Sequence, residues 1–304
     1  MAVESTTSAS AGASGAEGFD FALYRYQLSL PFAIAAVVVF AVLTLLHVWR
    51  IYRHRSFYFT AFTIGGCFQV VGYCGRIWSH FDSTAIGGFV MQAILILVAP
   101  ALYAASIYMI LGRLIRALHA EPASIVPVKW MTKIFVIGDV LSFLMQAGGG
   151  GIQAAGTLEL YNVGEKIIIV GLFVQIVMFG FFLVTTVLFH LRFRQSSSSH
   201  GQQESPIRWK HHLAVLYVTS AIIMVRSIFR VVEYLQGNRG YLISHEVFLY
   251  VFDALLMAMV MAVFFVFYVE DLELSESGKR ESAMEMLSSQ DSNGRGIVPR
   301  PYGV

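Results

Sequence analysis

The sequence has few charged residues and only two cysteines. Asp, Glu, Lys and Arg make up 13% of its 304 residues and hydrophobic residues 57%, whereas soluble domains carry about 25% charged residues. The formal net charge is +2, and without a basic cluster we expect no nucleic-acid partner. Cys67 and Cys74 share a helix face but are too far apart for a mutual disulfide, so we expect buried small hydrophobic side chains. This composition indicates a membrane protein.

The sequence also lacks the motifs of several membrane enzymes and receptors. It has no G-x-x-x-x-G-K-[ST] motif for nucleotide hydrolysis, and its last apolar segment has no lysine for a retinal Schiff base. We interpret the nine histidines as helix-end or loop residues, and no H-E-x-x-H motif occurs, so we expect no metal site and no cofactor. The third apolar segment ends in LGRLIRAL instead of the acidic–Arg–aromatic triplet of large receptor families. An enzyme is therefore not expected, while a divergent sensor remains compatible.

Seven apolar segments are long enough to cross a bilayer, which needs about 20 residues in a helix. They are residues 29–49, 57–79, 85–111, 131–152, 166–190, 213–235 and 243–269. Lys and Arg gather in alternate loops and in the C-terminal tail, which by the positive-inside rule predicts an N-terminus outside and a cytoplasmic C-terminus. The predicted fold is an all-α membrane protein, a seven-transmembrane-helix bundle.

Three predicted regions follow from these spans. Residues 1–23 form a disordered extracellular segment, residues 24–270 the transmembrane domain, and residues 271–304 a disordered cytoplasmic tail. The serine-rich stretch at residues 195–206, between the fifth and sixth segments, is also predicted to be disordered because it contains too few apolar residues to pack.

Polar residues recur at helical spacing on four of the predicted spans. The stripes consist of Gln69, Tyr73 and Arg76; Asp139, Ser142 and Gln146; Arg226, Arg230 and Glu233; and Glu246, Tyr250 and Asp253, and Gln92 lies on the third span. Charges within a bilayer are costly unless they are paired or wetted, so we expect the stripes to face one another. A rise of ~1.5 Å per residue places them from the midplane outward. This predicts a polar vestibule open toward the outer leaflet or the extracellular face, above an almost purely apolar inner half.

The same residues can instead be structural ion pairs. Arg230 and Glu233 can pair at i, i+3, whereas Arg226 and Arg230 repel each other at i, i+4. One of these arginines therefore needs an acid from another helix, and Asp253 and Asp139 are the deep candidates. Two backbone irregularities are also expected: an unwound stretch at Gly148–Gly151 and a kink at Pro100.

Five motifs in order carry a family resemblance. The second span reads QVVGYCGR (Gln69–Arg76), the third QAILILVAPALYAASIYMILGR (Gln92–Arg113) and the fourth FVIGDVLSFLMQAGGGGIQ (Phe135–Gln153). The sixth and seventh supply R-x-x-x-R-x-x-E…Q-G…G-Y…E…Y-x-x-D. Together, over roughly residues 24–270, they resemble the fungal lipid-translocating exporter family of RTA-like proteins. Gln69 stands where that family's signature has an acid, which suggests that Arg76 pairs with Glu246 instead.

The resemblance implies a transporter that moves amphipathic lipids, such as sphingoid long-chain bases, or hydrophobic toxic compounds such as sterol-like drugs. It implies lipid export or drug and stress resistance, membrane lipids and amphipathic small molecules as partners, and the plasma membrane as location. Our hypothesis is that the acids attract a protonated amine, that Tyr and Gln side chains bind its hydroxyl groups, and that the arginines balance the acids in the empty site. Proton exchange at Asp139 or Asp253 could supply energy. The alternatives are a seven-helix lipid or pH sensor and a purely structural scaffold, and the sequence indicates no oligomeric state.

Overall fold

The computed structural model describes residues 29–54, 59–82, 86–118, 120–153, 158–199, 209–236 and 246–267. Within these ranges every regular element is helical. The predicted segments at residues 1–23 and 271–304 lie outside the described residues. The long helices are α1 (Leu30–His54), α2 (Thr60–Phe81), α3 (Ile86–Ala117), α4 (Val128–Gln153), α5 (Leu158–Ser199) and α6 (Trp209–Leu235). A short 3-10 turn, η2 (Glu121–Ala123), lies between α3 and α4.

The last helix is built from three consecutive elements. It begins as α8 (Glu246–Leu249), widens into the π-helical turn η3 (Tyr250–Leu255) and continues as α9 (Leu256–Val266). A π-helical turn bonds i to i+5 and is rare within α-helices. Glu246, Tyr250 and Asp253 lie in α8 and η3, so the wide turn coincides with the polar stripe of this helix.

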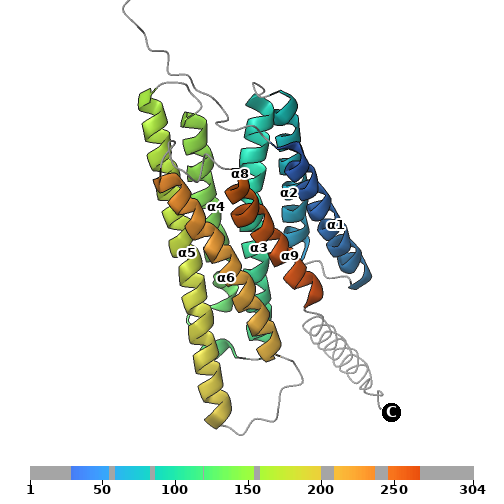
Figure 1. Cartoon of the computed structure of the whole chain (residues 1–304). Coiled ribbons are helices and arrows are strands. Elements are labelled where there is room, and N and C mark those ends of the chain that lie inside the picture. The colour runs from blue at the N-terminus through green and yellow to red at the C-terminus, as the bar shows by residue number, and fades with distance from the viewer. Residues whose placement is uncertain are drawn as a thin grey trace, which may run out of the picture.

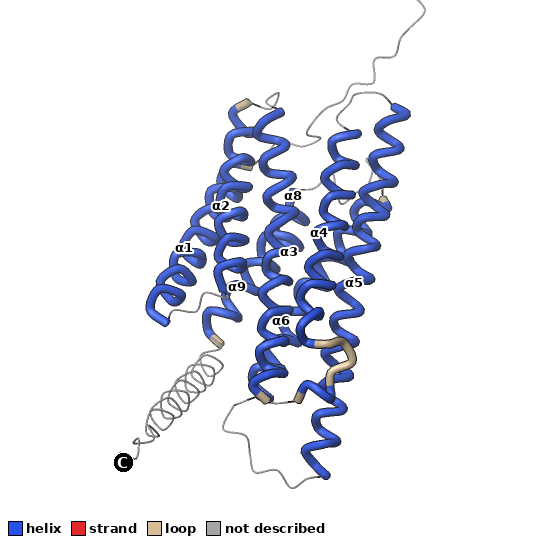
Figure 2. The backbone as a smooth tube through the Cα atoms, turned by 180° about the vertical axis from the view of Figure 1, so that it is seen from behind, coloured by secondary structure: helices blue, strands red, loops and turns tan. Residues whose placement is uncertain are grey.

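The helices form one elongated bundle in which neighbours in the sequence run in opposite directions (Figure 1). Each long helix packs on the next one along the chain, and the last helix contacts both α6 and α1. Helix α3 contacts α6 in addition to its neighbours α2 and α4. Figure 2, which shows the bundle from behind, has α3 in front of α6. Helix α1 begins at one end of the bundle and α9 ends at the other (Figure 1).

Five of the helical stretches in the described ranges are long and apolar enough to cross a membrane. They are Leu30–Arg53, Val90–Ala117, Glu159–Gln195, Trp209–Leu235 and Glu246–Val266. Helices α2 and α4 have similar lengths, but their buried faces carry polar and glycine residues in place of apolar ones. All seven predicted spans coincide with observed helices, and their ends differ by up to nine residues where both are described.

Three local expectations are wrong. Gly148–Gly151 do not unwind, because α4 continues to Gln153. Gly149 is the reason: its hydrogens face Gly164 of α5 so closely that a Cβ there would lie 2.7 Å from the Gly164 carbonyl oxygen. Residues 195–199 of the predicted disordered stretch belong to α5. Cys67 and Cys74 are free, as expected, but they are exposed on the outside of α2 instead of buried. Pro100 lies inside α3, and Pro31 lies in the first turn of α1.

Replacing Gly149 by alanine should force α4 and α5 apart. The added methyl group would meet backbone, which cannot rotate away, and overpacking of this kind costs about 1–3 kcal/mol. Gly148 is the matched control, because a Cβ there has nothing within 4 Å and alanine raises helix propensity by about 0.5–1 kcal/mol. Denaturant unfolding of both variants in detergent should show Gly149→Ala destabilised and Gly148→Ala unchanged or more stable. Equal stabilities would contradict the close α4–α5 crossing.

Candidate functional site

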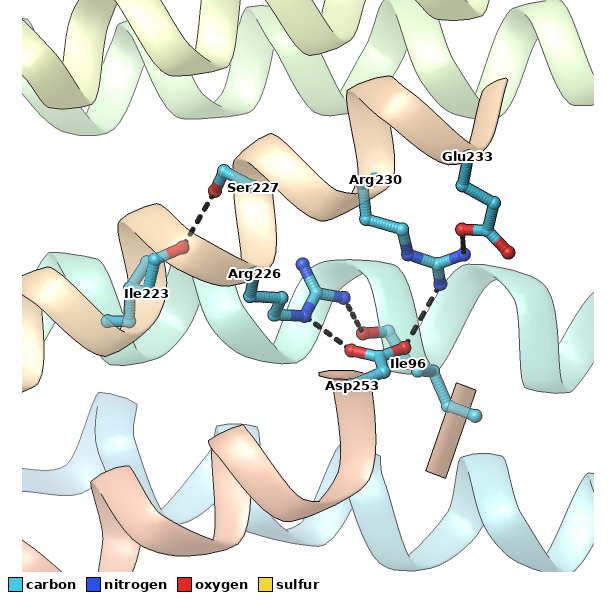
Figure 3. A network of polar contacts seen from close by, with 7 residues as sticks. All are labelled: Ile96, Ile223, Arg226, Ser227, Arg230, Glu233 and Asp253. Carbon is cyan, nitrogen blue, oxygen red and sulfur yellow. Dashed lines mark hydrogen bonds and ion pairs between the residues drawn. The ribbon is translucent and has the colours of Figure 1, made fainter. Parts of the chain in front are cut away.

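The Asp253 carboxylate lies between two arginines of α6 (Figure 3). Arg226 donates from Nε to Asp253 Oδ1 in a short ion pair, and Arg230 donates from Nη2 to Oδ2 at 3.1 Å. The side chains of Arg226 and Asp253 are each only 2% exposed. Arg226 also reaches the Ile96 carbonyl of α3 at 3.4 Å. One carboxylate therefore bridges two like charges that stand one helical turn apart, and with Arg226 it joins α3, α6 and the last helix.

Arg230 has a second acid on its own helix. Its Nη1 donates to Glu233 Oε2 at 2.9 Å, which is the i, i+3 pair expected from the sequence. Ser227, on the same helix, donates instead to the Ile223 carbonyl (Figure 3). Arg230 thus bridges Glu233 and Asp253, while its Nε atom is buried with no partner among the described residues.

A second ion pair lies where the last helix begins. Arg76 of α2 donates to Glu246 at 2.8 Å and to the Tyr250 hydroxyl at 3.0 Å, and its Nη1 lies 3.5 Å from Gln92 Oε1 of α3. The Glu246 carboxylate also accepts from the backbone N–H and the hydroxyl of Ser29, at 2.9 and 2.6 Å. The pairing of Arg76 with Glu246 is therefore confirmed, and Ser29 ties the start of α1 to the same acid.

The two ion-pair groups together, which we call the charge network, hold three arginines and three acids. They are Arg76, Arg226, Arg230, Glu233, Glu246 and Asp253. With each group ionised the network is electrically neutral. Neutrality explains how six charged side chains are tolerated inside an apolar bundle, because an unpaired buried charge costs several kcal/mol.

Beside the charge network, Gln69 and Tyr73 of α2 are fully buried. The Tyr73 ring stacks between Phe40 of α1 and Tyr250 of η3, with centroid distances of 5.5 and 6.1 Å. The Tyr73 hydroxyl and both polar atoms of the Gln69 amide have no hydrogen-bond partner among the described residues. A buried polar atom without a partner costs about 1–3 kcal/mol, so these positions are candidates for contact with water or with a ligand.

The polar residues of α4 make their contacts outside the charge network. Asp139 accepts a 2.8 Å hydrogen bond from Tyr108 of α3, Ser142 donates to the Asp139 carbonyl, and Gln146 donates to Gln175 of α5 at 3.1 Å. Asp139 is therefore not the acid that serves Arg226, and the four stripes form two groups instead of one vestibule.

Two further expectations about the polar residues are corrected. Arg76, Arg226 and Asp253 are at most 2% exposed, so the predicted open vestibule is not seen around these three side chains. The other half of the bundle is not purely apolar: His47 is buried inside α1, where its Nε2 lies 3.0 Å from the Met261 carbonyl, and Thr44 is buried one turn before it. Single polar residues in apolar segments give no periodic signal, and this is why they were missed.

An apolar groove of about 470 Å³ runs between α1 and α9 on the outside of the bundle. It is lined by Val38, Val39, Val42, Leu43, Leu255, Ala258, Met259 and Ala262. Its volume lies within the ~300–1,000 Å³ of small-molecule sites. No group of three or more His, Cys, Asp or Glu side chains that could hold a metal occurs in the described part of the chain.

Substituting Asp253 by Asn should strongly destabilise the bundle. A neutral amide leaves the buried Arg226 guanidinium without a counter-ion and Arg230 with Glu233 alone, and breaking a buried pair costs about 3–5 kcal/mol. Glu233→Gln is the control, because Arg230 keeps Asp253 as its partner; its loss should be about 1.5 kcal/mol. Thermal unfolding in detergent measures both, and an Asp253→Asn variant as stable as Glu233→Gln would refute the bridging role.

Comparison with known proteins identifies the family and several relatives of the chain. Residues 62–273 match the family described as "RTA1 like protein". Among curated proteins of Saccharomyces cerevisiae, the Protoporphyrin uptake protein 1 is 34% identical over 280 residues, which cover 80% of this chain and 91% of that protein. Protein RTA1 is 36% identical over 275 residues, covering 82% and 85%. The Sphingoid long-chain base transporter RSB1 is 27% identical over 273 residues, covering 79% and 71%.

No solved structure matches the chain significantly. The family match covers most of the chain, and its range includes the charge network and the motifs of the second, third, fourth, sixth and seventh spans. With its apolar helices, the chain is therefore an integral membrane protein of the RTA1-like family.

Proposed function

We propose that the protein is a translocator of amphipathic lipids or hydrophobic toxic compounds, with sphingoid long-chain bases and sterol-like molecules as the substrate class. In this role it contributes to lipid export or to drug and stress resistance. It works as a seven-helix transmembrane protein of the plasma membrane, and it uses no catalysis. The observation that carries the proposal is the neutral charge network inside an otherwise apolar bundle.

The proposed membrane orientation rests on the distribution of Lys and Arg and on the directions of the helices. The end of α1 carries Arg50 and Arg53, and Lys and Arg recur in the other loops at that end and in the C-terminal tail. The alternating direction of the helices in Figure 1 is consistent with an odd number of crossings. By the positive-inside rule, this end faces the cytoplasm and the N-terminus faces outward.

The names of two relatives support the substrate class. One relative is a sphingoid long-chain base transporter and another a protoporphyrin uptake protein. Both named ligands combine a large apolar part with ionisable groups. A site for such molecules must offer charge to the polar part without leaving unpaired charge in the empty protein, and the charge network meets both conditions.

The mechanism follows from the two oxygens of the Glu246 carboxylate. Oε1 pairs with Arg76 and Oε2 accepts from Ser29, so an incoming ammonium group can displace the Ser29 hydroxyl from Oε2 while Arg76 keeps Oε1 and its contact with the Tyr250 hydroxyl. Gln92 Oε1 lies near Arg76 as a further acceptor. Sharing a carboxylate in this way costs less than exposing a bare charge to hydrocarbon. Glu246 is more accessible for this step than Asp253, at 11% side-chain exposure against 2%.

Replacing Glu246 by Gln should slow the movement of a chain-labelled fluorescent long-chain base across proteoliposome membranes. Glutamine keeps the size and the acceptor oxygen but loses the charge that binds the ammonium group, and we expect a loss of about tenfold or more. Glu159→Gln is the matched control, since Glu159 also lies in the first turn of a helix but is exposed. Equal rates for Glu246→Gln and wild type would show that the network does not bind the headgroup.

The same proteoliposome assay, run without ATP, identifies the energy source and also tests the alternative function, a sensor. Faster movement under a pH gradient supports a proton-coupled exporter, and movement independent of the gradient supports a facilitator or scramblase. A folded protein that moves no base would refute translocation of this substrate and favour the sensor.

A further inference from the structure

A row of partnerless polar atoms lies where α1, α2 and α9 meet, which we call the seam. The atoms are Thr44 Oγ1, His47 Nδ1, both polar atoms of the Gln69 amide and the Tyr73 hydroxyl. Their side chains are at least nine-tenths buried. Buried polar groups in native proteins are nearly always hydrogen-bonded, so several partnerless atoms in one row call for an explanation.

Contacts place Thr44, His47 and Tyr73 together, and Gln69 lies on the same buried face of α2 as Gly66 and Tyr73. A Cβ on Gly66 of α2 would collide with Thr44 Oγ1 of α1 and lie 3.0 Å from the Met261 side chain of α9. His47 bonds to the Met261 carbonyl and packs on Phe62 of α2. Tyr73 stacks on Phe40, one turn before Thr44. The row therefore continues from the charge network toward the far half of the bundle along a single three-helix junction.

The apolar groove borders the seam on the outside of the bundle. Leu43 lines the groove, and the next residue, Thr44, belongs to the seam. On the last helix, Leu255 lines the groove two residues after Asp253 of the charge network. Only the packing of α1 against α9 separates an apolar surface open to lipid from polar atoms that lack partners.

Hydrogen bonds join α1 to the last helix at both ends of the groove but not along its lining. Ser29 bonds to Glu246 at one end. At the other end His47 bonds to the Met261 carbonyl and Arg50 to the Phe265 carbonyl. Between these points the groove residues are all aliphatic or Met. The middle of α1 can therefore separate from α9 without breaking a hydrogen bond.

We propose that the groove between α1 and α9 is a lateral portal for a single-chain amphiphile, whose hydrocarbon chain occupies the groove while Thr44, Gln69 and Tyr73 bind its hydroxyl groups. This inference deepens the proposed function and rests on it. The three side chains offer both donors and acceptors and no charge, which suits small hydroxyl-bearing headgroups. Binding supplies the partners that these atoms lack in the closed bundle.

The test uses Thr44→Val and Gln69→Leu, which keep side-chain size and remove the partnerless polar atoms. A structural role predicts unchanged transport, and removal of an unsatisfied polar group should not lower the melting temperature. The portal predicts that the same stable variants move chain-labelled sphingosine about tenfold more slowly. Thr219→Val is the control, because the Thr219 hydroxyl is buried but bonded to the Val215 carbonyl within α6.

A second measurement reads binding without transport. Sphingosine with a photoreactive group at the end of its chain should label residues 38–43 and 255–262, as detected by mass spectrometry of the proteoliposomes. Ala258→Trp, which fills the groove, should remove this labelling, whereas Val177→Trp on the exposed side of α5 should not.

The outcomes separate the portal from the proposed function. If wild type moves sphingosine, while both seam variants keep its rate and labelling spreads evenly over lipid-facing residues, the portal is refuted and translocation stands. If wild type moves none but labelling is confined to the groove and lost in Ala258→Trp, the groove binds the chain and translocation fails. Slow seam variants together with groove labelling support both.

Discussion

The Asp253 carboxylate holds two arginines of α6 and, through Arg226, links α6 and the last helix to α3. Arg226 and Arg230 stand one turn apart and would repel each other in a medium of low polarity. Because Asp253 bridges them, both can remain buried, and Arg226 can also reach the backbone of α3. The carboxylate lies in the π-helical turn η3. The π-helical turn of the last helix thus carries the acid that pairs with both arginines. Turns of this kind often occur at functional sites.

Helix α1 is attached differently from the helices that surround α3. Its start and its final turns are hydrogen-bonded to the last helix through Ser29, His47 and Arg50, whereas aliphatic side chains line the groove between them. By contrast, α4 and α5 cross at Gly149 and Gly164 with their backbones in direct contact. Close backbone packing fixes two helices along their length. The fold therefore combines a closely packed pair of helices, α4 and α5, with an α1–α9 contact that is hydrogen-bonded at its two ends.

The sequence predicted the helices well because an apolar segment of about 20 residues has few other solutions in a bilayer. It also predicted the Arg230–Glu233 pair from spacing, and the Arg76–Glu246 pair from the departure at Gln69 from the signature of the family that it resembles. It could not supply the partners Ser29, Tyr108 and Gln175, because they depend on the rotation and tilt of neighbouring helices. Hydrophobicity cannot distinguish a side chain that faces lipid from one that faces the core, and for this reason Cys67 and Cys74 were misplaced. Helix propensity alone failed at Gly148–Gly151, where packing on α5 decides.

The equality of three positive and three negative groups has an electrical consequence. A charge that crosses the membrane potential gains or loses about 2.3 kcal/mol per 100 mV. The charge network sums to zero, so a rearrangement that moves it as a unit along the membrane normal performs almost no electrical work. The membrane potential then acts on the bound substrate alone. It drives the movement of a protonated amine and has no effect on an uncharged sterol.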